Sequence, residues 1–357
     1  MYMYDYGIWK PIFKKSLGPL SAINERMYWL NNMMPSDLPN LHASPTLFIA
    51  SDYSGEHASA DYQTISIVIT DANAFYDWNR QRLKVRQQYL SDGRRMSFKQ
   101  LRDQRRWRSL IPFLLAANEL RGLSATIAIH SSIDTLFAGT NPLDLNNPSF
   151  AKYSHWNKRS LEKLFRVIHF ISIFLAGMSR TGQNVLWLTD DDSIAPNVGG
   201  LTELTELFSY VASEYLDYNL GHLRVGIPSI SDTPDRLLED LIAIPDLIAG
   251  AVSEILILQG SDKELIINIP PSVYLAPDPF RSAFIHPQSK DFRVYTAGQD
   301  KLLSQQETMS AKTAFILNWL GDRDQKMKRL AAIIDPVSKS DKLSFRWLNF
   351  HAYNDTH

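Results

Sequence analysis

The order of its apolar segments is the feature that most limits the folds open to this chain. Four segments rich in β-branched residues are typical of buried strands, and they cover residues 46–51, 63–70, 124–131 and 184–189. Only a short polar segment separates the first two, which predicts an antiparallel hairpin. Helix-like segments lie between the later ones. The order therefore predicts an α/β fold with a mixed sheet flanked by helices.

The remaining elements divide the 357-residue chain into three parts. Helices are expected over residues 71–90, 104–120, 157–178, 201–216 and 234–256, and short strands over 95–99 and 223–227. After these come a proline-rich extended segment at 269–287, a helix at 311–334 and a strand at 343–350. We therefore expect an irregular N-terminal arm (1–45), a core (46–258) and a C-terminal extension (259–357).

Composition excludes several classes of protein. The chain has no cysteine, so disulfides, thiolate zinc sites and a cysteine nucleophile are excluded. Its N-terminus lacks the apolar core of a secretion signal, and the longest apolar segment, residues 167–178, is too short to cross a bilayer. These features predict a soluble, cytoplasmic protein with no membrane partner.

Three aspartates lie at positions where an α/β fold can assemble a functional site. Asp52 is expected to end the first strand, Asp190 the strand at 184–189, and Asp246 lies on the last core helix. Strand ends are where α/β folds assemble their sites. Oxygen ligands suit Mg²⁺ or Mn²⁺, and neighbouring carboxylates repel one another without a cation. We therefore predict that these aspartates bind a divalent metal. Within the triplet at 190–192 the choice of ligand stays open: Asp190 is preferred because it directly follows the strand, and Asp192 comes second because it alternates with Asp190, ahead of Asp191.

Each aspartate also has a simpler explanation. Asp52 opens a sequence that favours a turn. The triplet that begins at Asp190 suits a solvated loop before a helix. Asp246 suits the first turn of a helix, where the helix dipole favours negative charge.

Short motifs around these aspartates resemble a known family. Asp52-Tyr-Ser-Gly55, the strand that ends in Asp190, and Pro245-Asp-Leu-Ile-Ala249 resemble a prokaryotic family of the ribonuclease H-like superfamily. That family has an Asp-Glu-Ser-Gly motif on its first strand and a late Ala-Asp-Leu-Ile-Ala helix. The resemblance covers roughly residues 46–256. It implies a ribonuclease H-like fold, a hydrolase that cleaves nucleic acid, and a role in defence against mobile elements such as phage.

The chain departs from the family pattern at three places. The family often has a Glu-x-Lys segment on its third strand, where this chain reads Arg95-Met-Ser-Phe-Lys99, without an acid. Tyr53 stands where the family has a glutamate, and Glu56 is the candidate substitute for it as a catalytic carboxylate. Pro245 replaces the usual alanine just before Asp246. These departures bear on activity more than on fold.

A basic segment suggests a nucleic-acid partner. Residues 80–108 hold eleven Lys or Arg against two acids, a local charge of +9 in a chain of net charge −1. The predicted contacts are Arg94, Arg95, Lys99, Arg102, Arg105 and Arg106. Cations bind phosphates, and interleaved aromatic residues can stack on unpaired bases. The alternative is a solvated helix face or a surface that pairs with an acidic partner.

Three functions follow from these features. The leading hypothesis is a metal-dependent nuclease that hydrolyses DNA or RNA at Asp52, Asp190 and Asp246. The first alternative is an inactive scaffold that binds nucleic acid or a protein partner. The second is a metal-dependent nucleotide-sugar transferase that uses Asp190-x-Asp192. The C-terminal extension is a candidate contact for a protein partner or a homo-oligomer.

Overall fold

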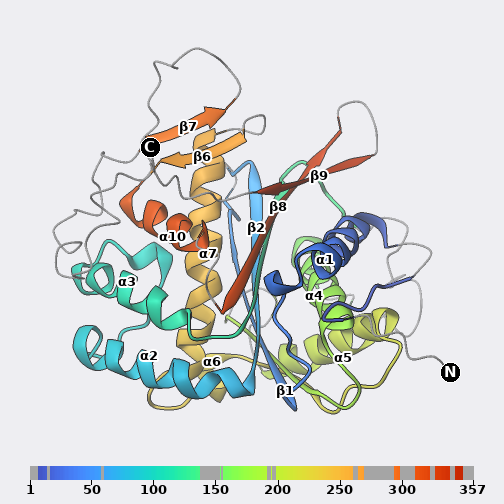
Figure 1. Cartoon of the computed structure of the whole chain (residues 1–357), viewed down its shortest axis with the longest axis horizontal. Coiled ribbons are helices and arrows are strands. Elements are labelled where there is room, and N and C mark those ends of the chain that lie inside the picture. The colour runs from blue at the N-terminus through green and yellow to red at the C-terminus, as the bar shows by residue number, and fades with distance from the viewer. Residues whose placement is uncertain are drawn as a thin grey trace. The chain divides into compact units, whose positions relative to one another are not determined.

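Figure 1 shows the elements of the chain in the computed structural model. The chain forms two compact units. The first unit comprises Met1–Ile49 and Ile133–Ser231, and the second comprises Ala50–Ser132 and Asp232–His357. The structure describes residues 7–13, 17–57, 60–136, 153, 156–190, 194, 198–259, 264–268, 293–297, 310–321, 326–337 and 342–348. This division differs from the expected arm, core and extension, because each unit combines segments that are distant in the sequence.

A seven-stranded sheet runs in the order β5-β4-β1-β2-β3-β8-β9. Its strands are β1 (Thr46–Ser54), β2 (Tyr62–Asp71), β3 (Gly122–His130), β4 (Asn184–Thr189), β5 (Leu223–Gly226), β8 (Met327–Pro336) and β9 (Leu343–Leu348). The β2–β3 pair is antiparallel, whereas β3–β8 and β4–β5 are parallel. This mixed sheet, with its flanking helices, confirms the predicted fold class and is consistent with a ribonuclease H-like fold.

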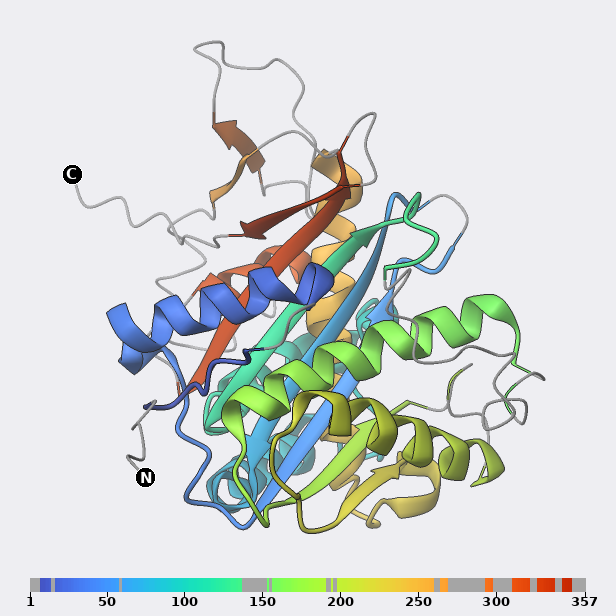
Figure 2. The same cartoon turned by 90° about the vertical axis from the view of Figure 1, so that its right-hand side faces the viewer.

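The first unit contains helices α1 (Ser21–Met33), α4 (Lys158–Met178), α5 (Val198–Tyr215) and α6 (Pro228–Ser231). Helices α4 and α5 pack side by side (Figure 2). Asn157 caps α4 by accepting a hydrogen bond from the Ser160 N–H at 2.8 Å. The Trp9 ring is fully buried and lies against Gly177 of α4, where a Cβ would come within 2.3 Å of it.

The prediction of an irregular N-terminal segment is wrong at α1. This helix buries Ile23, Met27 and Leu30, which are spaced four and three residues apart and so lie on one helical face. Polar and aromatic residues around them obscured the periodicity in the sequence.

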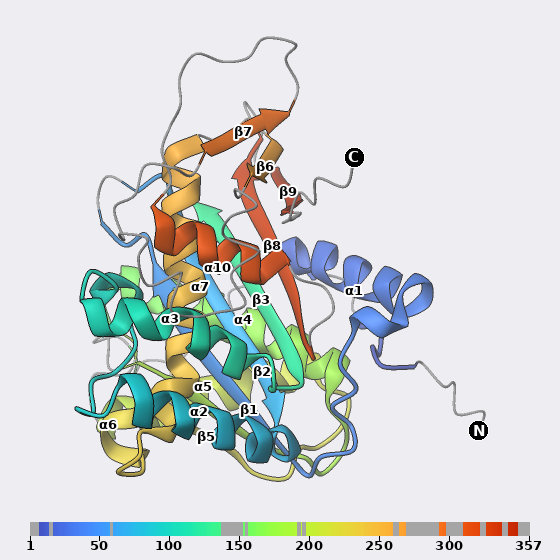
Figure 3. The same cartoon turned by 60° about the vertical axis from the view of Figure 1, so that its left-hand side comes forward.

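The second unit contains helices α2 (Phe75–Tyr89), α3 (Gln104–Ala117), α7 (Leu237–Gln259) and α10 (Ala311–Gly321), together with a β6–β7 hairpin (Glu264–Asn268 and Arg293–Ala297). Helix α7 packs on β2 and β3, α10 packs on α7, and α2 packs on α3 (Figure 3). Within this unit, α7 therefore links the sheet to the helices that surround the basic segment.

Two predicted elements are wrong, and one lies outside the described residues. The expected helix at 311–334 ends at Gly321, and residues 327–336 form β8, which is parallel to β3. A buried strand and a buried helix both appear as an unbroken apolar run, so periodicity does not separate them. Residues 95–99 are not a strand, because a 3₁₀ helix begins at Phe98. The proline-rich segment 269–287 lies outside the described residues.

Within the described part of the chain, every helix is too short or too polar to cross a membrane.

Candidate functional site

Asp52 lies inside β1 and does not end it. Strand β1 continues to Ser54 because Tyr53 is buried and extends the alternation of buried and half-buried residues. Asp52 itself is half-buried. Glu56, its predicted catalytic companion, is exposed in the turn after β1. Gly55 opens that turn with φ +77°, where a Cβ would lie 2.0 Å from the Tyr62 carbonyl oxygen.

Asp190 directly follows β4 and is half-buried, as the sequence predicts. Asp191 and Asp192 lie outside the described residues, so the metal role of Asp192 stays a prediction. The transferase alternative also stays a prediction, because its Asp190-x-Asp192 motif includes these two residues.

Asp246 has a local structural partner. It is half-buried on α7, and its Oδ2 accepts a hydrogen bond from the backbone N–H of Phe98 at 2.8 Å. Phe98 begins a 3₁₀ helix (Phe98–Gln100) and packs against Gly250, one turn further along α7. The Asp246 carboxylate therefore fixes the segment that leads into α3.

A half-buried lysine completes the surroundings of Asp246. The Lys312 Nζ lies 3.7 Å from the centroid of the Phe98 ring and 3.6 Å from Glu254. Burial lowers the pKa of the Lys312 ammonium, against the opposing effects of Glu254 and Asp246. An ammonium group thus already offsets negative charge on this part of α7.

The described residues do not show the predicted metal centre. Among them, no group of three or more His, Asp or Glu side chains is arranged to hold a metal ion. Asp191 and Asp192 are not part of that set. We therefore derive no catalytic step through Mg²⁺ or Mn²⁺.

Part of the basic segment is held by nearby acids and carbonyls. Arg94 donates to Asp92 and to Asp103, with 2.6 Å between its Nη1 and Asp103 Oδ2. Arg105 also donates to Asp92, at 2.7 Å. Arg106 donates to the Arg95 carbonyl at 2.8 Å. These contacts fasten the turn at Asp92 to the start of α3.

The two acids of this turn are held in their ionised form. The hydrogen bond from Arg94 lowers the pKa of Asp92 to about 2. The pKa of Asp103 is also lowered, chiefly by the backbone N–H of Arg106, because Asp103 caps α3.

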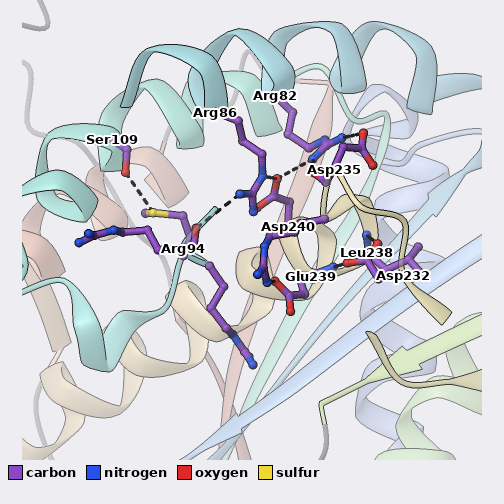
Figure 4. A network of polar contacts seen from close by, with 12 residues as sticks. Arg82, Arg86, Arg94, Ser109, Asp232, Asp235, Leu238, Glu239 and Asp240 are labelled. Atoms are coloured by element: carbon purple, nitrogen blue, oxygen red, sulfur yellow. Dashed lines mark hydrogen bonds and ion pairs between the residues drawn. The ribbon is translucent and has the colours of Figure 1, made fainter. Parts of the chain in front are cut away.

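Two further arginines are buried in an ion-pair network that sequence reasoning missed. Arg82 and Asp240 have no exposed side-chain surface, and Arg86 is 10% exposed (Figure 4). Arg86 donates to both carboxylate oxygens of Asp240 at 2.6 Å, and Arg82 donates at 2.8 Å. Burial raises the pKa of Asp240, and the hydrogen bonds from the two arginines oppose that rise.

The network also engages Asp235, which accepts from Arg82 at 2.5 Å. Arg82 and Arg86 share the buried face of α2 with Trp78 and Val85. Arginines four residues apart among core positions were the available signal for this network. These two arginines are not available to an outside ligand.

Six cations of the segment remain exposed. Arg80 and Lys84 lie on α2, and we call the other four the α3 cation cluster: Lys99, Arg102, Arg105 and Arg108. Arg105 pairs with Asp92, whereas the other three have no acidic partner among the described residues. Arg108 was not among the predicted contacts. Arg94, Arg95 and Arg106 are only partly exposed.

Comparison with known proteins adds little to this description. No protein-family model and no curated protein matches the chain. One similar solved structure is the ribonuclease H2 from Pyrococcus horikoshii OT3, with a TM-score of 0.28 and 11% sequence identity over 56% of this chain and 70% of that one. Likeness at this level carries no argument about activity.

Proposed function

We propose that this protein binds nucleic acid through the α3 cation cluster. The observation that supports the proposal is the presence of four exposed cations within ten residues, three of which lack an acidic partner in the described part of the chain. Cations of this kind neutralise phosphates and release counterions, which gives affinity without sequence recognition. Since the whole chain has a net charge of −1, the attraction comes from this local surface.

The position of Arg105 and Arg108, the two cluster residues on α3, supports the same proposal. Arg105 and Arg108 lie in the first turns of α3, where the positive end of the helix dipole disfavours cations. The N-cap Asp103 partly offsets this cost. An approaching phosphate would offset this cost through the Arg105 and Arg108 side chains, whereas Asp103 already occupies the N–H groups of Arg105 and Arg106.

A charge-matched pair of triple variants tests the proposal. The test variant carries Lys99→Ala, Arg102→Ala and Arg108→Ala. The control removes three exposed cations outside the basic segment, with Lys158→Ala, Arg224→Ala and Lys342→Ala. At about 0.5 kcal/mol for each exposed charge contact, the test variant should bind a short labelled duplex about tenfold more weakly. Equal affinity of both variants would refute the proposal.

Metal-dependent hydrolysis is a second candidate function. It is supported by Asp190, which is half-buried directly after β4 as predicted, and by the half-buried Asp52. If the nuclease hypothesis is right, Asp52→Asn and Asp190→Asn abolish cleavage that depends on Mg²⁺ or Mn²⁺. Unchanged cleavage in both variants would eliminate it, and tight binding without turnover would support the inactive scaffold. A role in defence against mobile elements stays a prediction.

A further inference from the structure

Three of the four aromatic rings in or next to the basic segment are buried. Trp78, Phe98 and Trp107 are 1%, 8% and 6% exposed. They therefore offer no accessible face to a nucleobase, although their sequence positions among the basic residues suggested one.

Each of these rings already has a partner inside the second unit. Trp78 meets Phe75 edge-on at 5.1 Å between ring centroids, and Trp107 meets Phe315 at 5.6 Å. Phe98 lies between Gly250 and the Lys312 ammonium. Proteins that hold single strands stack successive bases on exposed aromatic rings. The α3 cation cluster has no such ring from this group.

The four cations have a regular spacing. Lys99, Arg102, Arg105 and Arg108 follow one another at intervals of three residues. Residues three apart are neighbours on a helical surface, and Arg105 and Arg108 therefore share one face of α3. Three of the four are arginines, whose planar guanidinium groups bind phosphate oxygens in pairs.

Hydrogen bonds to neighbouring residues also hold the segment that carries the cluster in place. Asp246 accepts the N–H at the start of the 3₁₀ helix, and Arg94 ties the preceding turn to Asp103. A surface fixed in this way is preorganised for a ligand of fixed shape.

We infer that the α3 cation cluster binds the phosphate backbone of a nucleic-acid duplex and does not read the bases of single strands. This inference rests on the proposed function. Binding by charge alone follows the density of phosphates, and a duplex carries about one charge per 1.7 Å of axis, twice the density of one of its strands. Stacking, which would favour a single strand, is unavailable to the buried rings.

The experiment compares a duplex with its two separated strands, at equal length and composition, for the wild-type protein. Separate DNA and RNA arms identify which duplex is preferred. For four contacts, the slope of log Kobs against log salt should be about −3.6 for B-DNA and about −2.8 for a single strand. The duplex should also bind more tightly at each low salt concentration. A single strand that binds as tightly as the duplex would overturn the inference.

A variant pair tests the role of stacking directly. Tyr76 is 77% exposed at the start of α2, and Tyr89 is half-buried at its end. We expect Tyr76→Ala and Tyr89→Ala to leave the affinity for both ligands unchanged. A loss of single-strand affinity of tenfold or more in either variant would overturn the inference while leaving nucleic-acid binding itself intact.

Failure of the proposed function gives a different pattern. It would appear as no binding to any strand, or as binding that the Lys99→Ala, Arg102→Ala and Arg108→Ala variant retains in full. Capture of polyglutamate as tightly as of a duplex would also overturn the inference, because the cluster would then recognise a polyanionic protein as well as it does a phosphate backbone.

Discussion

Replacing Asp240 by asparagine should destabilise the second unit strongly. Asp240 has no exposed side-chain surface and accepts three hydrogen bonds from two arginines. Asp240→Asn removes the negative charge and keeps the size of the side chain. Arg82 retains Asp235 and Asn79 as partners, so most of the loss falls on Arg86.

The expected cost follows from the contacts of Arg86. Both of its short bonds, at 2.6 Å, go to Asp240, and it also donates a longer 3.4 Å bond to the Arg94 carbonyl. A hydrogen bond to a charged group is worth about 1.5–3 kcal/mol, and an uncompensated buried charge costs about 3–5 kcal/mol. We therefore expect Asp240→Asn to lower the free energy of unfolding by about 3–5 kcal/mol.

Urea unfolding followed by tryptophan fluorescence measures this loss, since Trp78 is buried beside Arg82. Asp77→Asn is the matched control, because Asp77 pairs with Arg80 on the surface and its loss should cost less than about 1 kcal/mol. A triple change of Arg82→Met, Arg86→Met and Asp240→Leu should restore most of the stability, as apolar replacements of buried ion pairs often do. A loss below about 1 kcal/mol for Asp240→Asn would refute the reasoning.

Three further changes test other parts of the structure. Burial lowers the pKa of His169 from 6.5 to about 4. The contribution of its neutral imidazole to the free energy of unfolding is therefore fully present above pH 6.5 and is lost as the pH falls towards 4. Between these pH values, the titration of His169 should lower the free energy of unfolding of the wild-type protein by about 3 kcal/mol. The His169→Gln variant should lose less over the same range, as measured by urea titrations. Asp246→Ala should lower the free energy of unfolding by about 1–3 kcal/mol, because it leaves the Phe98 N–H without its acceptor. Asp246→Asn should lower it by less in the same assay. Gly250→Ala should lower the melting temperature through a loss of about 1–3 kcal/mol, because its Cβ would lie 2.2 Å from Phe98; an unchanged melting temperature would contradict the packing described.

Local sequence patterns predicted most of the secondary structure. Strand β4 was predicted with its bounds, and helix α4 was predicted to within one residue, because the hydrophobic period is visible in a few neighbouring residues. Strand β8 was mistaken for a helix, since the run Ala331–Ile334 is buried on both faces and has no alternation.

The roles of individual charged residues were less predictable. The partner of Asp246 lies 148 residues away in the sequence, and that of Arg86 lies 154 residues away. Such contacts depend on how helices pack and not on local spacing. For the same reason, the sequence did not distinguish the cations that face solvent, such as Arg102, from those that are buried, such as Arg82.

The salt dependence of nucleic-acid binding tests the central claim most directly. The slope of log Kobs against log salt counts the phosphates that the protein neutralises, independently of absolute affinity. For a B-DNA duplex, the Lys99→Ala, Arg102→Ala and Arg108→Ala variant should have a slope shallower than that of the wild type by about 2.7, which is about 0.9 for each lost contact. An identical slope in the two proteins would show that these cations do not contact phosphate, and would contradict the account.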